Sequence, residues 1–451
     1  MTPAVPPRRR AWIEAFGCQM NLLDGEAAAG DLRARGWAPA ASPEEADLLV
    51  FNTCSVRQHA EDRVWSRLGA LADRKRRDPA LLVAVMGCMA QREGEALLRR
   101  APAVDVVVGT RRYGDLARLL EEAEATGRRL ASLSTDGFHE AVRDVAVRAE
   151  RHRGWVSVMR GCCHRCSFCV VPAVRGPQYD RDAASILEEV RRLADDGAAE
   201  IFLLGQNINT WGRTLPGRPT LDSLLREVHD VPGARRIRFL TSNPMDLEAG
   251  LLDAMGSLPR VMPYLHFPAQ HGNDAVLRRM HRGYTRARYL DLAAEARRRV
   301  PGVELASDLI VGFPGETEEE FADLLSLVEE ARWTMAFVFK YSARPGTAAA
   351  DLPDPVPEEV KSRRHAAVMA AQARVERGIL AARVGTEVEV LVDGPSARVP
   401  LRMAGRTEHH QLAVLPPGVG APGGFLRARV VSSSARVLHV EPVGAAVPAR
   451  A

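Results

Sequence analysis

Short apolar runs alternate with longer amphipathic segments through most of this chain. Between residues 10 and 120, segments with helical spacing separate four apolar runs. These runs are AWIEAF, DLLVFN, LLVAVM and VDVVVG. The alternation predicts parallel strands joined by helices, and hence an α/β sheet domain over residues 10–125.

Residues 126–152 carry many charges and no continuous apolar face, so we expect a linker there. The alternation then resumes over residues 153–380. Its six candidate strands are WVSVMR, EIFLLG, RIRFLT, YLHFPA, ELASDLIVG and FVFKYS. Six consecutive βα units predict an open barrel of the TIM type, and the stretch from Pro357 predicts a long connecting helix.

The pattern changes again after this helix. Residues 383–446 give short β runs separated by Gly and Pro, which predicts a small all-β barrel. From Arg383 to the end there are eight arginines and five acids, a mild basic surplus. Small β barrels with scattered arginines commonly bind RNA through shape and phosphate contacts. The candidate RNA-binding residues are Arg402, Arg406, Arg427 and Arg429.

The overall composition is that of an ordinary globular protein. Hydrophobic residues make up 46% and charged residues 26% of the 451 residues. No apolar run approaches the roughly 20 residues that span a bilayer, and the N-terminal stretch lacks the apolar core of a secretory signal. We therefore expect a cytoplasmic protein without membrane contact. The net charge of +4 permits an RNA partner but does not require one.

Seven cysteines in a long cytoplasmic chain argue against a disulfide framework. Four of them gather in GCCHRCSFC, where Cys162, Cys166 and Cys169 have C-x3-C-x2-C spacing. This loop follows the first strand of the expected barrel, at the end where α/β barrels place their chemistry. Three thiolates can hold three irons of a [4Fe–4S] cluster and leave the fourth iron open to a ligand.

A structural zinc site is the alternative for this loop. Zinc usually takes four Cys or His ligands, so His164 or Cys163 would have to supply the fourth. Both lie crowded between the other ligands, and we expect Cys163 to be a spectator.

The remaining cysteines, Cys18, Cys54 and Cys88, each follow directly on an apolar run. In a parallel sheet the C-terminal strand ends share one edge, so the three thiols are expected to converge there. Gly17 and Gly87 suit tight strand exits. The alternative is three unrelated buried cysteines, since Cys often serves as a small hydrophobe. Convergence predicts a second cluster with three protein ligands.

Together the two cysteine sets resemble the methylthiotransferase family of radical S-adenosylmethionine (SAM) enzymes. The resemblance extends over nearly the whole chain. The matching stretches are GCQMN, NTCSVR, LLGQNIN, RIRFLTSNP, RRMHRGYT, DLIVGFPGETEEEF and FKYSARPGT. The resemblance implies an N-terminal methylthiotransferase domain, a radical SAM core and a C-terminal TRAM domain that binds RNA.

The family resemblance also implies a reaction. Two [4Fe–4S] clusters and two SAM molecules would take part. One SAM would methylate sulfur at the N-terminal cluster, and the other would give an adenosyl radical at the core cluster. The product would carry a methylthio group on carbon 2 of N6-isopentenyladenosine, next to the anticodon in tRNA. Expected partners are tRNA, an electron donor such as flavodoxin or ferredoxin, and the iron–sulfur assembly machinery, with the enzyme itself a monomer.

The same resemblance implies contacts to SAM from the strand-end loops. The residues are Phe168, Gly205, Gln206, Ser242 and Gly312. The chain departs from the usual family pattern with QHGN in place of QSGS, TSNP in place of TSHP, and an aspartate before Arg181. These departures leave the six cysteines intact.

Three alternatives remain open. The tRNA substrate could be threonylcarbamoyl adenosine, or the acceptor could be an aspartate of a ribosomal protein in a related branch of the family. The third is a zinc-containing RNA-binding protein without catalysis.

Overall fold

The computed structural model divides into two compact units. The first unit comprises Met1–Ala149, Arg160–His164 and Cys169–Tyr179, and the second comprises Glu150–Met159, Arg165–Phe168 and Asp180–Ala451. The residues described are 9–56, 58–137, 147–148, 150–353, 355–397 and 399–444.

A six-stranded parallel sheet forms the centre of the first unit, in the order β2-β1-β3-β4-β5-β6. Its strands are β1 (Arg10–Ala15), β2 (Ala38–Pro39), β3 (Leu48–Thr53), β4 (Leu82–Gly87), β5 (Val106–Val108) and β6 (Leu130–Ser132). Every residue of β3 and β4 is buried, as expected for parallel strands covered on both faces.

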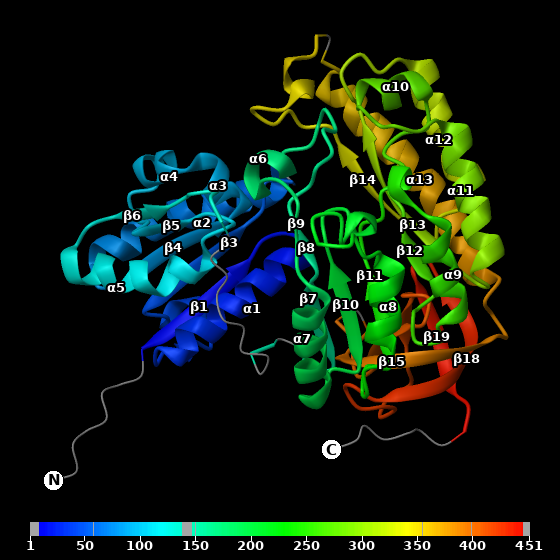
Figure 1. Cartoon of the computed structure of the whole chain (residues 1–451), viewed down its shortest axis with the longest axis horizontal. Coiled ribbons are helices and arrows are strands. Elements are labelled where there is room, and N and C mark those ends of the chain that lie inside the picture. Colours follow the sequence, from blue (N-terminus) through cyan, green and yellow to red (C-terminus); the bar gives the residue numbers. More distant parts are fainter. Residues whose placement is uncertain are drawn as a thin grey trace. The chain divides into compact units, whose positions relative to one another are not determined.

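Helices cover both faces of this sheet (Figure 1). They are α1 (Gln19–Ala34), α2 (Gln58–Arg77), α3 (Cys88–Glu93), α4 (Glu95–Arg100), α5 (Leu116–Thr126) and α6 (Val171–Arg175), with the 3-10 turns η1 (Pro43–Glu45) and η2 (Tyr113–Asp115). Alternate residues of each strand point to opposite faces. Accordingly, Leu49 and Phe51 pack with α2, α3 and α4, whereas Leu48 and Val50 pack with α1 and α5.

Six parallel strands in chain order form the central barrel of the second unit, as the sequence predicts. They are β7 (Arg153–Ser157), β10 (Glu200–Leu204), β11 (Arg236–Phe239), β12 (Tyr264–His266), β13 (Glu304–Val311) and β14 (Met335–Lys340). Two three-stranded sheets, β7-β10-β11 and β12-β13-β14, meet at a parallel bridge between Ile237 and Val261. The result is an open barrel.

The other elements of this unit surround the barrel or connect its strands (Figure 1). The helices are α7 (Ala183–Asp195), α8 (Leu221–His229), α9 (Ala249–Ser257), α10 (Asp274–Arg279), α11 (Arg286–Arg299), α12 (Glu318–Ala331) and α13 (Glu358–Ala381). The short elements are η3 (Ile208–Thr210), η4 (Pro244–Asp246), η5 (Ala348–Asp351), β8 (Met159–Arg160) and β9 (Tyr179–Asp180). α13 is the long helix expected from Pro357.

The C-terminal segment folds into a closed five-stranded barrel in the order β15-β16-β17-β19-β18. Its strands are β15 (Glu387–Pro395), β16 (Met403–Thr407), β17 (Leu412–Val414), β18 (Phe425–Ser434) and β19 (Val437–Pro442). The turn between β16 and β17 enters the N-terminal end of the central barrel. There the ring of His410 lies 5.8 Å from that of Phe202 and 5.1 Å from that of Tyr264.

These observations confirm the predicted fold class. Residues 130–132 of the expected linker form the edge strand β6, while residues 138–146 and 149 lie outside the described part. Residues 160–164 and 169–179, expected in the central barrel, group with the N-terminal sheet. Within the described ranges, no helix is long and apolar enough to cross a membrane.

Candidate functional site

Three neighbouring strands of the N-terminal sheet each end in a cysteine. Cys18 stands between β1 and α1, Cys54 follows β3, and Cys88 is the first residue of α3 after β4. Since β3 pairs with both β1 and β4 in parallel, the three cysteines share one edge of the sheet. The strand order reverses at β1, and ligands bind at such switch points of open α/β sheets.

Glycines bring these strand ends into close contact. A Cβ atom added to Gly17 would lie 2.6 Å from the Cβ and 3.1 Å from the Sγ of Cys54. A Cβ added to Gly87 would lie 2.5 Å from the Thr53 carbonyl oxygen, and its φ of +99° also favours glycine. The residue before Cys18 and the residue before Cys88 thus both pack against the end of β3.

A buried amide pair joins the Cys18 turn to β3. Asn21 Nδ2 donates to Asn52 Oδ1 at 2.9 Å, and Asn52 Nδ2 donates to the Asn21 carbonyl at 2.7 Å. The Cys18 thiol lies 3.3 Å from Asn21 Oδ1. These bonds explain why a polar asparagine occupies a fully buried strand end.

Cys88 lies in a buried environment that contains both a positively and a negatively charged side chain. Burial raises the pKa of its thiol, and the nearby guanidinium of Arg175 opposes this effect. Arg175 is supplied by α6, and Val170 and Val174 of the same segment pack against Cys88. The carboxylate of Asp24 balances the charge, since it pairs with Arg175 at 3.3 Å and with Arg160 at 2.7 Å.

The predicted core-cluster loop is anchored on both sides. In the first unit, the Cys162 amide donates to the Gly176 carbonyl at 3.3 Å. In the second unit, the Ser167 amide donates to the Met280 carbonyl at 3.1 Å, and Phe168 packs against an apolar cluster that includes Phe313. Cys163 is exposed.

A half-buried guanidinium contacts the middle cysteine of this loop. Arg282 Nη1 donates to Cys166 Sγ at 3.3 Å. Burial acts to lower the pKa of Arg282, but Tyr284 and Cys166 raise it above its ordinary value.

Two of the predicted SAM contacts carry buried oxygen atoms without a hydrogen-bond partner among the described residues. They are Gln206 Oε1 and Ser242 Oγ, at the C-terminal ends of β10 and β11. Gly205 and Gly312 have steric reasons to be glycine. An added Cβ would lie 2.6 Å from Met159 Cγ or 2.3 Å from Lys361 Cγ, respectively.

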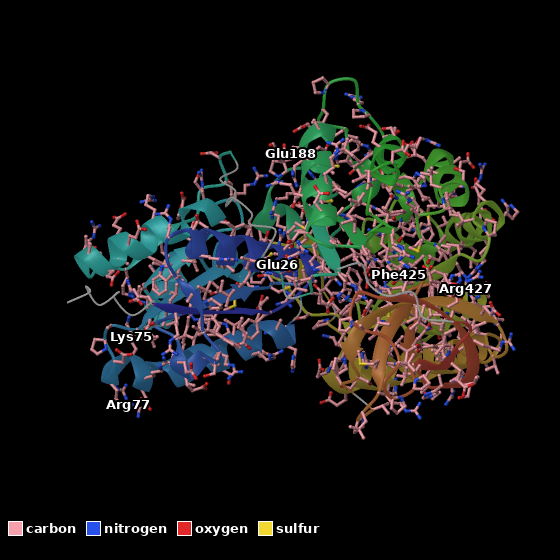
Figure 2. The ribbon with its side chains drawn as sticks, turned by 90° about the horizontal axis from the view of Figure 1, so that it is seen from below. Glu26, Lys75, Arg77, Glu188, Phe425 and Arg427 are labelled. Atoms are coloured by element: carbon pink, nitrogen blue, oxygen red, sulfur yellow. The ribbon has the colours of Figure 1, made fainter. Side chains whose placement is uncertain are left out.

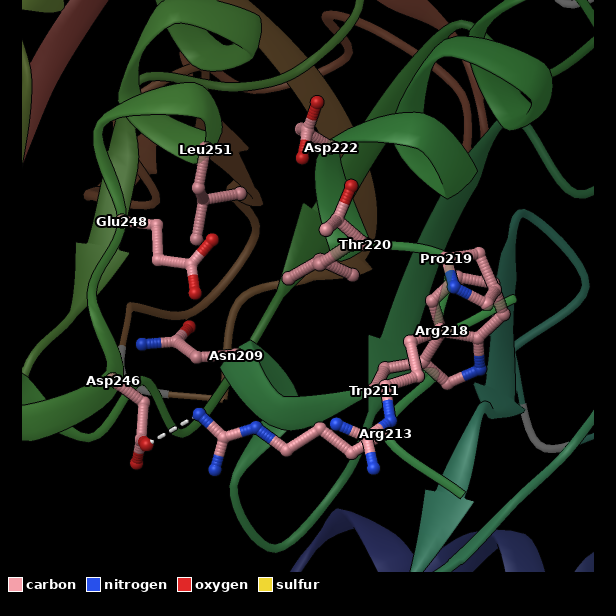
Figure 3. Close-up of a pocket in the computed structure, with 11 residues that line it drawn as sticks. Asn209, Trp211, Arg213, Arg218, Pro219, Thr220, Asp222, Asp246, Glu248 and Leu251 are labelled. Carbon is pink, nitrogen blue, oxygen red and sulfur yellow. Dashed lines mark hydrogen bonds and ion pairs between the residues drawn. The ribbon is translucent and has the colours of Figure 1, made fainter. Parts of the chain in front are cut away.

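A pocket of about 350 Å³ opens beside these loops, with walls from η3, η4 and the starts of α8 and α9 (Figure 3). Arg213 and Asp246 form an ion pair of 2.8 Å in its wall, and Glu248 and Asp222 add two further acids. The pocket lining carries charges of both signs and also apolar side chains. Gln206 and Ser242 are not among its lining residues.

The predicted RNA-binding arginines divide into two groups. Arg427 and Arg429 are exposed on β18, and Figure 2 shows Arg427 on the C-terminal barrel. Arg402 is half-buried. Arg406 is half-buried beside the contact between the two barrels. Its guanidinium donates to the His410 carbonyl at 3.3 Å, and burial lowers its pKa.

Within the described residues, no group of three or more Cys, His, Asp or Glu side chains is arranged around a single metal ion.

Two family models match the chain. The uncharacterized protein family UPF0004 matches residues 10–109, and the Radical SAM superfamily matches residues 156–328. Proteins named tRNA-2-methylthio-N(6)-dimethylallyladenosine synthase match almost the full length. The one from Arthrobacter sp. (strain FB24) is 40% identical, covering 98% of this chain and 86% of the relative. The one from Carboxydothermus hydrogenoformans is 39% identical, covering 96% and 98%.

This chain belongs to the tRNA-2-methylthio-N(6)-dimethylallyladenosine synthase family. Its fold also resembles that of a solved radical SAM methyltransferase, TsrM from Kitasatospora setae, at a TM-score of 0.54. The two chains are 16% identical, and the match covers 76% of this chain and 77% of the other. At this identity the likeness concerns the fold alone. Family membership confirms that the protein is a radical SAM enzyme.

Sequence reasoning missed Arg175 and Arg282, the two arginines that lie beside cysteines. Arg175 stands six residues after Cys169, which gives a local signal: a charged residue in an otherwise apolar VVPAVRG segment. Arg282 is separated from Cys166 by more than a hundred residues. Only packing reveals that contact.

Proposed function

We propose that this synthase-family enzyme adds a methylthio group to carbon 2 of N6-isopentenyladenosine next to the anticodon in tRNA. It would use two SAM molecules and two [4Fe–4S] clusters. The observation that supports the proposal is the position of Cys18, Cys54 and Cys88 at neighbouring strand ends on one edge of the sheet, in a chain that also has the C-x3-C-x2-C loop. The names of the family members support the tRNA substrate.

The residues around the N-terminal cysteines fit a cluster. Three buried polar atoms nearby have no hydrogen-bond partner within the described ranges: Ser55 Oγ, Tyr113 OH and Arg175 Nη1. Ser55 follows Cys54 in sequence, and Tyr113 and Arg175 interact electrostatically with Cys88. Buried polar atoms normally have partners, so this set suits a polar group held by the three thiols.

The residues of the central barrel fit the core cluster and SAM. Cys162, Cys166 and Cys169 would hold three irons, and the open iron would bind SAM. The unpartnered oxygens of Gln206 and Ser242 suit a ligand that donates hydrogen bonds, as the SAM amino group does. When bound, these cofactors supply the electron transfer, the sulfur and the methyl group, and the protein supplies orientation and excludes water.

The closed barrel would contact tRNA through the exposed arginines of β18. Arg427 and Arg429 lie on one face of the strand because they are two positions apart. Cationic side chains on an exposed strand position the RNA backbone without reading its sequence. An electron donor such as flavodoxin or ferredoxin and the cluster-assembly machinery stay predictions.

Nucleoside mass spectrometry of tRNA from a host lacking this gene tests the proposal. We expect 2-methylthio-isopentenyladenosine to disappear, isopentenyladenosine to accumulate, and the intact gene to restore the product. An unchanged pool would refute the substrate assignment. The threonylcarbamoyl adenosine pool and the ribosomal aspartate would then be measured by the same method.

Cysteine variants test the division of labour. Replacing Cys18, Cys54 and Cys88 together with Ala should abolish methylthiolation, reduce bound iron by about half, and leave SAM cleavage in place. Cys163→Ala is the matched control and should retain both activities, because its thiol is exposed and outside both sets. Loss of SAM cleavage in the triple variant, with the core cluster still loaded, would contradict the assignment.

A further inference from the structure

Arg282 holds a fixed position against Cys166 because all three of its nitrogen atoms are engaged. Nη1 donates to Cys166 Sγ at 3.3 Å, and Nε donates to Tyr284 OH at 2.9 Å. Nη2 donates to Asn243 Oδ1 at 3.1 Å and to the Pro268 carbonyl at 3.4 Å. Four of the five N–H groups of the guanidinium are thus engaged, so its charge stays beside the sulfur.

The partners of Arg282 are themselves held in place. Tyr284 OH donates to the Ala269 carbonyl at 2.9 Å, and Asn243 Oδ1 also accepts from the Met245 amide at 3.2 Å. They come from the strand-end loops that follow β11 and β12 and from the segment that follows α10. The contact thus fixes the middle cysteine relative to the C-terminal rim of the barrel.

Every partner of the guanidinium found in the described ranges is neutral, apart from the cysteine. The oxygens belong to a tyrosine, an asparagine amide and a backbone carbonyl. No carboxylate within the described part of the chain pairs with Arg282 to balance its charge. A thiolate at Cys166 would be its counter-charge, and charge-assisted hydrogen bonds of this kind are stronger than neutral ones.

We propose that Arg282 is a positioning residue that fixes Cys166 and raises the reduction potential of the core cluster. The proposal rests on the proposed function, since it requires a cluster at Cys162, Cys166 and Cys169. Hydrogen bonds to the sulfurs and nearby charge set the potentials of iron–sulfur clusters. Reduction adds negative charge, so a fixed positive charge stabilises the reduced form more than the oxidised form.

The test uses the full chain with Cys18, Cys54 and Cys88 replaced by Ala, so that the core cluster alone is present. In this parent we compare Arg282→Gln, which removes the charge, with Arg282→Lys, which keeps it. The exposed Arg278→Gln on α10 is the matched control. Iron and sulfide per chain are measured first, and the midpoint potential is then determined by redox titration followed by electron paramagnetic resonance.

We expect Arg282→Gln to lower the ratio of reduced to oxidised cluster at a fixed potential at least tenfold, which equals about 59 mV for one electron. Arg282→Lys should shift the ratio less than Arg282→Gln, and Arg278→Gln should leave it unchanged. A ratio within threefold of the parent in Arg282→Gln would overturn the proposal. Equal shifts in the Lys and Gln variants would also overturn it, because charge would then not be the cause.

Arg282→Gln could fail to bind the cluster at all, and the Arg282→Lys variant then shows whether the lost charge is the reason. If Arg282→Gln binds no iron, an Arg282→Lys chain that loads the cluster supports the charge argument. An Arg282→Lys chain that also binds none overturns it. If the parent itself binds no iron, the proposed function fails, which distinguishes that failure from a failure of the role of Arg282.

Discussion

The carboxylate of Glu200 joins two arginines at the N-terminal end of the central barrel, and we expect Glu200→Gln to destabilise the second unit. Glu200 accepts from Arg153 Nε and from Arg238 Nε, each at 2.7 Å, and its side chain has no exposed surface. The same arginines hold the closed barrel. Arg153 donates to Asp393 at 2.6 Å, and Arg238 donates to the Thr407 carbonyl at 2.8 Å.

The magnitude follows from burial and geometry. Glutamine keeps the shape of Glu200 but removes the charge between two guanidiniums whose side chains are only 9% and 1% exposed. Removing one partner of a buried ion pair costs about 3–5 kcal/mol, because the remaining charge is left uncompensated. At about 2–4 °C per kcal/mol, the unfolding midpoint should fall by roughly 10 °C.

The change of the unfolding free energy with pH gives a second prediction, and its direction follows from the pKa of Glu200. Burial acts to raise the pKa of Glu200, but Arg238 and Arg153 outweigh it and hold the pKa well below its ordinary value of 4.5. A depressed folded-state pKa contributes stability that is present above pH 4.5 and is lost as the pH falls toward the folded-state pKa. The parent should therefore lose stability over this acid range more steeply than Glu200→Gln.

The assay is thermal and urea unfolding followed by circular dichroism, with both proteins in the same cluster-loaded or cluster-free form. Glu188→Gln is the matched control, since Glu188 is exposed on α7 (Figure 2) and should change stability by less than about 0.5 kcal/mol. A Glu200→Gln protein within about 1 kcal/mol of the parent and with the same acid slope would refute the reasoning.

Three further predictions concern the proposed RNA surface, the contact between the barrels and the surroundings of the N-terminal cysteines. Replacing Arg427 and Arg429 with Ala should weaken tRNA binding and reduce its salt dependence by about one unit per lost phosphate contact, measured by filter binding at several salt concentrations. Arg406→Ala should instead lower stability and leave the salt slope unchanged. Asp24→Asn should lower the urea-unfolding free energy of the first unit by about 3 kcal/mol, because it leaves Arg175 without its counter-charge. Equal stability of Asp24→Asn and the parent would contradict the last prediction.

Periodicity predicted most of the secondary structure because long or strongly apolar strands give a clear signal. β3 and β4 have continuous apolar runs and β13 has eight residues, and all three were found where expected. The edge strands β2 and β6 were missed because they have only two and three residues. Such short segments form strands because a neighbouring strand already offers a row of unpaired hydrogen-bonding groups. The sequence of the short segment itself does not show that this neighbour is present.

The exposure of the proposed RNA-binding arginines follows the strand pattern only in part. Arg427 and Arg429 alternate with buried residues along β18, so their exposure follows from the period of a strand. Arg406 lies on β16, where contact between the barrels leaves its side chain 34% exposed. The contact between the barrels involves Arg236, whose Nη1 donates to the Arg406 carbonyl at 2.9 Å across a separation of 170 residues.

By itself the sequence determined the fold class, the order of the domains and the two cysteine sets, because these depend on spacing along the chain and on strand ends that share an edge. Only the tertiary structure decided which charges face the cysteines. Arg175 reaches Cys88 because α6 packs with the N-terminal sheet, and Arg282 reaches Cys166 because α10 ends beside the cluster loop. The distances between such side chains depend on how remote segments pack, and electrostatic interactions inside a protein depend on these distances and on burial.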